Sequence, residues 1–226
     1  MKSNGEVKLF IGILVVAVAL VGVAVWPMLA SRPNVEGPKD SKLTKEKLVP
    51  AWSHVRGDDK ATAYVVEIGD YQCGFCGESV PKVKHTIDAY KEKIKFVFHA
   101  CQVMPSHTNA LILSAATEAA ADQGKYWEMH EAIYKAQKEF SDKPAKEAVD
   151  RLTKLAGDLK MDMLRFRSAL NKEEFYKKAS REEELVGSLR VTLTPTFFFI
   201  SPSGKVSEIA TPDLLESFLK KPPNWK

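Results

Sequence analysis

The chain is poor in cysteine, with three in 226 residues: Cys73, Cys76 and Cys101. That is too few for a small secreted fold that depends on disulfide bonds, and the odd number leaves at least one thiol without a partner in the chain. The sequence also has little excess charge, with 33 basic and 29 acidic residues and a formal net charge of +4. Because no basic cluster is interleaved with aromatic residues either, the composition does not favour a nucleic-acid-binding protein.

Long apolar runs are scarce too, but residues 9–30 contain no charged side chain. At 1.5 Å per residue, about 20 helical residues cross a hydrocarbon core of roughly 30 Å. Met28 and Ala30 make a poor signal-peptide cleavage site, since small residues are expected at both positions. We therefore predict an uncleaved membrane anchor in preference to a removed signal peptide. Basic residues flank the run on both sides, so the flanks do not decide its orientation.

The chain is expected to divide into four parts. A short tail covers residues 1–8, and the predicted transmembrane anchor covers residues 9–30. Residues 31–54 are polar and contain prolines and glycine, which is typical of a linker. The remainder, residues 55–226, is expected to form one domain in which a helical insertion covers about 105–189.

The residue pattern of the domain predicts an α/β fold. Residues 63–71 and 94–103 are short, largely apolar runs typical of buried strands, and a helix is expected between them, starting at the cysteines. Alanine-rich and amphipathic segments predict helix to about Leu189. The apolar run 196–200, a turn, a further strand and a last helix near 213–220 follow. The predicted order is β-α-β, a helical block, then β-β-α.

Cys73 and Cys76 are two residues apart, a spacing that four chemistries use. Haem attachment needs histidine directly after the second cysteine, where this chain has Gly77, and zinc usually takes a second pair of ligands at similar spacing. A structural disulfide that closes so short a loop constrains little of the unfolded chain. A redox-active dithiol fits best, because the pair lies where a predicted strand gives way to a predicted helix.

The helix N-terminus is expected to make the Cys73 thiol more acidic. Unpaired N–H groups and the helix dipole favour a negative charge there. A contribution of up to ~2 kcal/mol lowers a thiol pKa by roughly 1.5 from about 8.5. Gly74 and Phe75 add backbone N–H groups but no side-chain charge, so we predict a moderately activated thiolate with a pKa near neutrality.

Three segments in this order carry a resemblance to a known family: YVVEIGDYQCGFCGESVP, HTNALILSAATEAAADQGKYWEMHEAIY and TPTFFFI. From about Val55 to its end, the chain resembles the membrane-anchored bacterial DsbA-like thioredoxin-fold oxidoreductases. The resemblance implies a thioredoxin-like fold with an inserted helical domain, here preceded by an N-terminal transmembrane helix. It also implies thiol–disulfide exchange on exported polypeptides.

The resemblance also implies roles for individual residues. Cys73 matches the attacking thiol of the family and Cys76 the resolving thiol. Pro195 matches a proline held in cis beside the dithiol, which brings the Thr194 backbone close to the sulfurs, where a substrate peptide can pair as an added strand. Glu67 matches a buried acid, and we expect it to accept the proton of Cys76 and to have a raised pKa; the alternative is an ion pair with a nearby lysine.

Gly74 and Phe75 are expected to join Thr194 in binding the substrate. Two positions depart from the family pattern, since proline is common at the place of Gly74 and glycine at the place of Leu193. Because of these departures, the resemblance does not fix the redox potential of the pair or the shape of the substrate groove.

The expected reaction is oxidation of substrate dithiols by the Cys73–Cys76 disulfide, with no metal and no cofactor besides that pair. The expected partners are cysteine-containing exported polypeptides, the membrane through the N-terminal helix, and a quinone-linked membrane protein that re-oxidises the pair, or one that delivers reductant. The catalytic domain is expected on the extracytoplasmic side, in the periplasm or on the outer surface. The alternatives are a reductase or isomerase of the same fold, a tethered peptide-binding or chaperone module, and a domain facing the cytosol.

The remaining polar candidates have simpler explanations. Cys101 is expected to be a buried small residue, with a third redox role as the alternative. The two-residue period of a strand places His99 on the same face as Cys101, and a contact between His99 and Glu67 across the sheet is a further hypothesis. His107 and His130 are interpreted as polar partners in the helical block and not as metal ligands.

Overall fold

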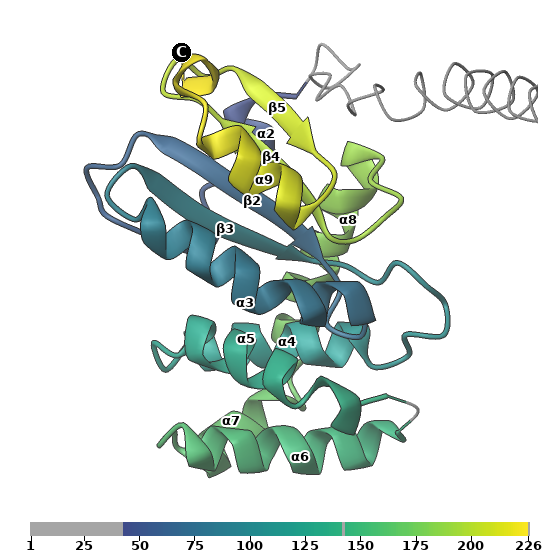
Figure 1. The fold of residues 1–226 in the computed structure, drawn as a ribbon. Coiled ribbons are helices and arrows are strands. Elements are labelled where there is room, and N and C mark those ends of the chain that lie inside the picture. Colours follow the sequence, from purple (N-terminus) through teal and green to yellow (C-terminus); the bar gives the residue numbers. More distant parts are fainter. Residues whose placement is uncertain (1–42, 142, 226) are drawn as a thin grey trace, which may run out of the picture. The chain divides into compact units, whose positions relative to one another are not determined.

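A mixed β-sheet forms the centre of the molecule in the computed structural model, which describes residues 43–141 and 143–225. Within these residues five strands pair in the order β1-β3-β2-β4-β5 (Figure 1). β2 and β3 are parallel, and every other neighbouring pair is antiparallel. The strands are β1 Val55–Arg56, β2 Ala63–Gly69, β3 Ile94–Ala100, β4 Thr196–Ile200 and β5 Val206–Ile209.

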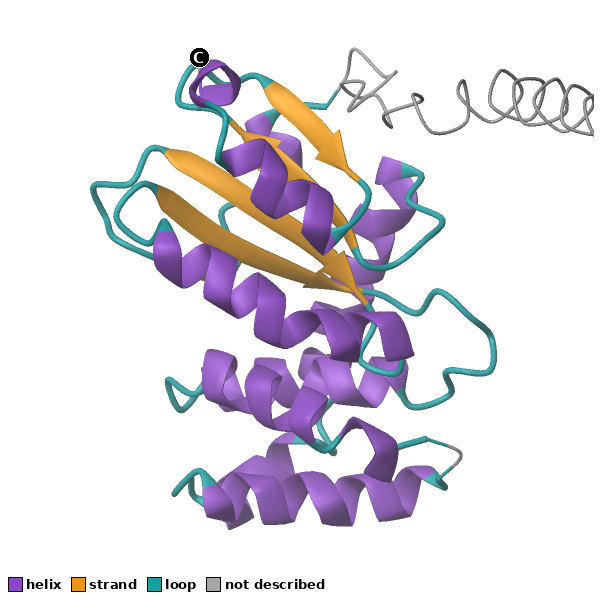
Figure 2. Ribbon diagram, viewed as in Figure 1, coloured by secondary structure: helices purple, strands orange, loops and turns teal. Residues whose placement is uncertain are grey.

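Helices surround the sheet and make up most of the chain between β3 and β4 (Figure 2). α4 and α5 lie between α3 and the pair α6 and α7, which is farthest from the sheet in Figure 1. The helices are α2 Lys45–Leu48, α3 Gly74–Ala89, α4 Ala110–Ala121, α5 Tyr126–Lys135, α6 Ala145–Asp158, α7 Met163–Ala169, α8 Glu173–Leu189 and α9 Pro212–Leu219, with short 3-10 helices η1 Gln137–Glu139 and η2 Pro222–Trp225.

Both faces of the sheet are covered, which explains why its central strands are apolar runs and not alternating ones. Val65 and Phe199 lie on one face, in a core shared with α3, α9 and the helical insertion. Val66 and Phe198 lie on the other, in a second core that includes residues of α2 and α8. The thioredoxin-like arrangement that the resemblance implies is therefore what the sheet and helices form.

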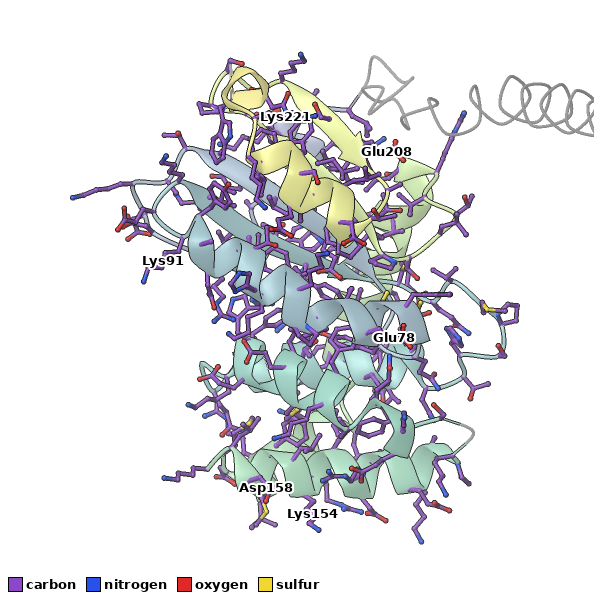
Figure 3. The ribbon with its side chains drawn as sticks, viewed as in Figure 1. Glu78, Lys91, Lys154, Asp158, Glu208 and Lys221 are labelled. Atoms are coloured by element: carbon purple, nitrogen blue, oxygen red, sulfur yellow. The ribbon has the colours of Figure 1, made fainter. Side chains whose placement is uncertain are left out.

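Helix α3 follows directly from the central strand β2. It packs on the sheet through residues at helical spacing, among them Cys76, Val83 and Ile87. Glu78 lies near the dithiol end of α3 in Figure 3, and Lys91 follows its other end. The connection from β2 places the cysteines at the edge of the sheet where the parallel strands β2 and β3 end.

Residues 43–54 belong to the predicted linker, and they contact the domain. Leu48 of α2 is fully buried, and its carbonyl oxygen lies 3.0 Å from His99 Nε2. Lys47 donates to the carbonyl of Ser188 at 3.0 Å. The predicted tail and anchor, residues 1–30, lie outside the described residues. None of the helices that the structure describes combines the length and apolarity that crossing a membrane requires.

Candidate active site around Cys73 and Cys76

Cys73 caps the N-terminus of α3, and the chain folds back locally to place it there. Its backbone N–H donates to the carbonyl of Asp70 at 3.0 Å, and its own carbonyl accepts from the N–H of Gly77 at 3.1 Å. Both cysteines are free thiols; Cys73 is partly exposed, whereas Cys76 is fully buried. An attacking partner can therefore reach the first sulfur but not the second.

The Cys73 thiol is strongly acidic. A hydrogen bond from the Cys76 thiol, together with the side chain of Thr194 and the backbone N–H groups of Cys76 and Phe75, outweighs the effect of partial burial and lowers the Cys73 pKa to about 5. This is below the near-neutral pKa that the helix dipole alone predicts. The difference arises because Cys76 and Thr194 add side-chain donors that the sequence argument did not include.

Cys76 has the opposite tendency. Its hydrogen bond to Cys73, its burial and the nearby charge of Glu67 all raise its pKa far above that of a free thiol. At neutral pH the reduced pair therefore holds one thiolate, on Cys73, and one proton, on Cys76. The two sulfurs differ in both access and acidity.

Glu67 lies in the centre of β2 and is 3% exposed. Burial raises the pKa of its carboxyl group to about 8. Among the described residues no lysine or arginine forms an ion pair with it, so the alternative of a simple ion pair has no support. Glu67 lines a small pocket with His130 and Trp127. When its carboxyl group is ionised, the negative charge raises the pKa of Cys76. A carboxyl of this acidity can exchange a proton near neutral pH.

The predicted contact between His99 and Glu67 is wrong. The parallel register pairs Glu67 with Phe98 and Ile68 with His99, so the two side chains point to opposite faces of the sheet. His99 instead contacts Glu182 of α8, with 2.5 Å between Nδ1 and Oε2. It helps to hold α8 and α2 on the second face.

The Thr194–Pro195 peptide bond is cis, as the resemblance implies, and it lies beside the dithiol. Cys73 Sγ is 3.5 Å from the carbonyl oxygen of Thr194, to which the thiol donates when it is protonated. Two large apolar side chains next to this contact are mostly exposed, Phe75 at 75% and Leu193 at 74%. A methyl group added at Gly74 would meet no atom within 4 Å, so the position after Cys73 faces open space.

A family model described as thioredoxin matches residues 51–221. The chain belongs to the thioredoxin family. The match begins within the segment 43–54 that contacts the domain and reaches into the C-terminal end, so it includes every candidate site residue named above.

Solved structures of DsbA-like proteins share the fold of this thioredoxin-family chain. BdbD from Bacillus subtilis is 23% identical with a TM-score of 0.64, covering 76% of this chain and 92% of that one. The thiol-disulfide exchange protein alpha-DsbA2 from Wolbachia pipientis is 22% identical with a TM-score of 0.61, covering 78% and 90%. At this identity the likeness establishes the thioredoxin-like fold.

Curated relatives of this thioredoxin-family chain are named as sodium/proton antiporters. NhaA 3 of Salinispora tropica is 32% identical over 149 residues, which is 66% of this chain and 22% of the relative. NhaA 1 of Mycobacterium sp. strain KMS is 29% identical over 125 residues, 55% of this chain and 20% of the relative. The chain thus spans about a fifth of the length of these relatives.

Two polar residues of the thioredoxin-family site were missed by the sequence reasoning. Asp70 is fully buried and accepts from the N–H of Gln72 at 2.8 Å, the N–H of Val103 at 2.9 Å and His107 Nδ1 at 2.7 Å. Because Asp70 lies only three residues before Cys73, its position in the sequence could have marked it as part of the site. Gln137 contacts the dithiol loop from the helical insertion, and nothing in its sequence neighbourhood marks it, since it lies 64 residues after Cys73.

Cys101 has the surroundings of an unreactive thiol. It is 7% exposed, its thiol lies 3.6 Å from the carbonyl of Gly69, and burial raises its pKa well above that of a free cysteine. These observations support the interpretation of Cys101 as a buried small residue.

Proposed function

We propose that this protein catalyses thiol–disulfide exchange and oxidises dithiols in exported polypeptides through the Cys73–Cys76 pair. The observation that carries the proposal is the contrast between the two sulfurs: a partly exposed thiol with a pKa of about 5 beside a fully buried thiol with a raised pKa. The exposed sulfur is accessible to a partner and leaves readily as a thiolate, whereas the buried sulfur holds its proton.

The reaction begins with the pair joined as a disulfide. A substrate thiolate attacks Cys73 Sγ and forms a mixed disulfide, the Cys73–Cys76 bond breaks, and the electron pair moves to Cys76. A second substrate thiolate then attacks the substrate sulfur of the mixed disulfide, and Cys73 leaves with the electron pair. The substrate dithiol has lost two electrons to become a disulfide, and the cysteine pair has gained them.

Glu67 supplies the proton that Cys76 needs when it leaves. A thiol with a raised pKa is a poor leaving group as a thiolate, so protonation must accompany the break of its bond. With a pKa of about 8, Glu67 carries a proton at neutral pH in its buried position. In the reverse direction the carboxylate takes the proton back from Cys76, and the resulting thiolate can attack Cys73 Sγ of a mixed disulfide.

The surface around Cys73 supports binding of an extended peptide. The backbone at Thr194, held beside Cys73, offers polar groups for pairing with a substrate strand. Phe75 and Leu193, which neighbour the dithiol and Thr194 in the chain, provide exposed apolar area, and Gly74 leaves room at the position after Cys73. Such a surface suits cysteine-containing segments of polypeptides that have not yet folded.

The direction and the location follow from the same chemistry. A stabilised leaving thiolate makes a disulfide oxidising, and oxidising exchange serves polypeptides outside the cytoplasm. We therefore place the domain on the extracytoplasmic side of the membrane, anchored through residues 9–30, with a quinone-linked membrane protein as the re-oxidising partner. The DsbA-like assignment in its membrane-anchored form belongs to this proposal.

Cys73→Ser tests the function, with Cys101→Ser as the matched control. Oxidation of a reduced two-cysteine peptide by the oxidised protein should be lost in Cys73→Ser and retained in Cys101→Ser. Full activity of Cys73→Ser would end the proposal. The equilibrium with glutathione decides the direction: a pair that is mostly reduced at the glutathione ratio of an oxidising compartment is an oxidase, and a pair that stays mostly oxidised there is a reductase.

A further inference from the structure

One side chain of the helical insertion makes contact with the loop that holds the dithiol. Gln137, in the short helix η1, donates through Nε2 to the carbonyl oxygen of Tyr71 at 2.9 Å and to that of Cys73 at 2.8 Å. Its Oε1 lies so close to Gly77 that a methyl group added there would come within 2.3 Å of it. The amide therefore touches the chain before, at and after the redox pair.

The Cys73 carbonyl belongs to the peptide unit that follows Cys73, and the Tyr71 carbonyl belongs to the unit between Tyr71 and Gln72, one residue earlier in the dithiol loop. The Cys73 carbonyl also accepts the first helical hydrogen bond of α3, from Gly77 at 3.1 Å. Fixing this carbonyl toward Gln137 and Gly77 keeps its oxygen turned away from Sγ. The N–H groups of Phe75 and Cys76, which stabilise the thiolate, then remain directed at the sulfur.

The charge distribution of the contact acts in the same direction. A primary amide presents two partly positive hydrogens, and here both point at carbonyl oxygens of the dithiol loop. They offset the negative ends of two peptide dipoles next to a sulfur that has to carry a negative charge. Without the amide, the negative ends of both peptide dipoles are no longer offset, and the dithiol loop loses two hydrogen bonds that hold its orientation. Both changes disfavour the Cys73 thiolate.

We propose that Gln137 is a positioning residue that sets the acidity of Cys73 and, through it, the balance between the dithiol and the disulfide. The proposal rests on the function proposed above. It assigns a redox role to the helical insertion, whose helices otherwise serve to pack against α3 and the sheet.

The first variant is Gln137→Met, which keeps the length of the side chain and removes both donors. We expect the pH midpoint for alkylation of Cys73 by iodoacetamide to rise. The equilibrium with glutathione should shift toward the disulfide by roughly fivefold, the factor that corresponds to one net hydrogen bond. Gln123→Met is the matched control, because Gln123 makes a comparable pair of hydrogen bonds, at 3.3 and 2.9 Å, with the backbone of Asp162.

The second variant, Gly77→Ala, separates the redox effect from stability. The added methyl group displaces the end of the Gln137 side chain, while alanine is favoured over glycine within a helix by roughly 0.5–1 kcal/mol. We expect a thermal midpoint at or above that of the wild type together with the same upward change in the alkylation midpoint. If Gln137 were only a structural clamp, Gly77→Ala would change the thermal midpoint and leave the alkylation midpoint of Cys73 unchanged.

The outcomes distinguish this inference from the proposed function. If Gln137→Met and Gly77→Ala keep the wild-type alkylation midpoint and glutathione equilibrium, Gln137 only packs, and the inference is wrong. If Gln123→Met shifts both quantities equally, general loosening explains the effect, and the inference is also wrong. If the wild type alkylates as an acidic thiol but exchanges with neither glutathione nor peptide, the proposed function fails, while the alkylation midpoints still report on Gln137.

Discussion

Replacing Cys76 by alanine should make the Cys73 thiol markedly less acidic. The hydrogen bond from Cys76 is the largest contribution to the lowered Cys73 pKa of about 5. A hydrogen bond to a charged group is worth ~1.5–3 kcal/mol, which corresponds to roughly 1–2 pKa units. We therefore expect a Cys73 pKa of about 6–7 in Cys76→Ala, still below that of a free thiol because Thr194 and the backbone donors remain.

The assay follows the rate of Cys73 alkylation by iodoacetamide between pH 3 and pH 10. Cys101→Ala serves as the common background, so that Cys73 is the sole cysteine of Cys76→Ala that reacts. Cys76→Ser is the control, since its hydroxyl group keeps a donor in the same place. We expect the pKa of Cys73 in Cys76→Ser to lie between those of the wild type and Cys76→Ala.

One result would refute this reasoning. A Cys73 pKa that stays at about 5 in Cys76→Ala would mean that the buried thiol is not the donor that stabilises the thiolate. The acidity of Cys73 would then come from Thr194 and the backbone N–H groups of the helix N-terminus, and the assignment of Cys76 as the main donor would be wrong.

Three further predictions concern the redox pair, the buried Glu67 and the buried Thr86 of α3. The reduction potential of the pair should fall by about 30 mV per pH unit above pH 5 and by about 59 mV per pH unit below pH 5. The reason is that reduction of the disulfide takes up two protons below the pKa of Cys73 and one proton above it. A single slope across pH 5 in a redox titration would contradict this prediction. Burial raises the Glu67 pKa from 4.5 to about 8, so the folded protein binds the extra proton between these values and loses stability as pH rises through them. Glu67→Gln should abolish that loss, which amounts to about 4 kcal/mol between pH 5 and pH 9 as measured by urea unfolding. An unchanged pH dependence would show another origin. Thr86→Val should raise the free energy of unfolding by about 1 kcal/mol, since the buried Thr86 hydroxyl has no hydrogen-bond partner in the part of the chain that the structure describes; destabilisation would point to a partner such as bound water.

The sequence by itself determined the order of the elements from β2 onward and the place of the redox pair, but not α2, which lies in the predicted linker, or the short strand β1. Apolar runs of strand length at residues 63–71 and 94–103 predict β2 and β3, because strands buried on both faces cannot be polar. The Cys-Gly-Phe-Cys spacing at the start of the following helix predicts a reactive thiol, since the N–H groups of a helix N-terminus are a local property of the backbone. The cis bond before Pro195 follows from the resemblance and is confirmed.

Tertiary structure alone decided the relations between segments that are distant in the chain. The register of β2 on β3 sends Glu67 to one face and His99 to the other, a difference that the residue pattern of either strand alone does not reveal. The pKa of Cys73 falls below the helix-dipole value because the Thr194 segment returns to the dithiol and Cys76 is buried beneath it. Gln137 reaches the same loop from the helical insertion. Local sequence sets backbone preference and burial pattern, whereas hydrogen bonds between distant segments depend on how the packed layers bring them together.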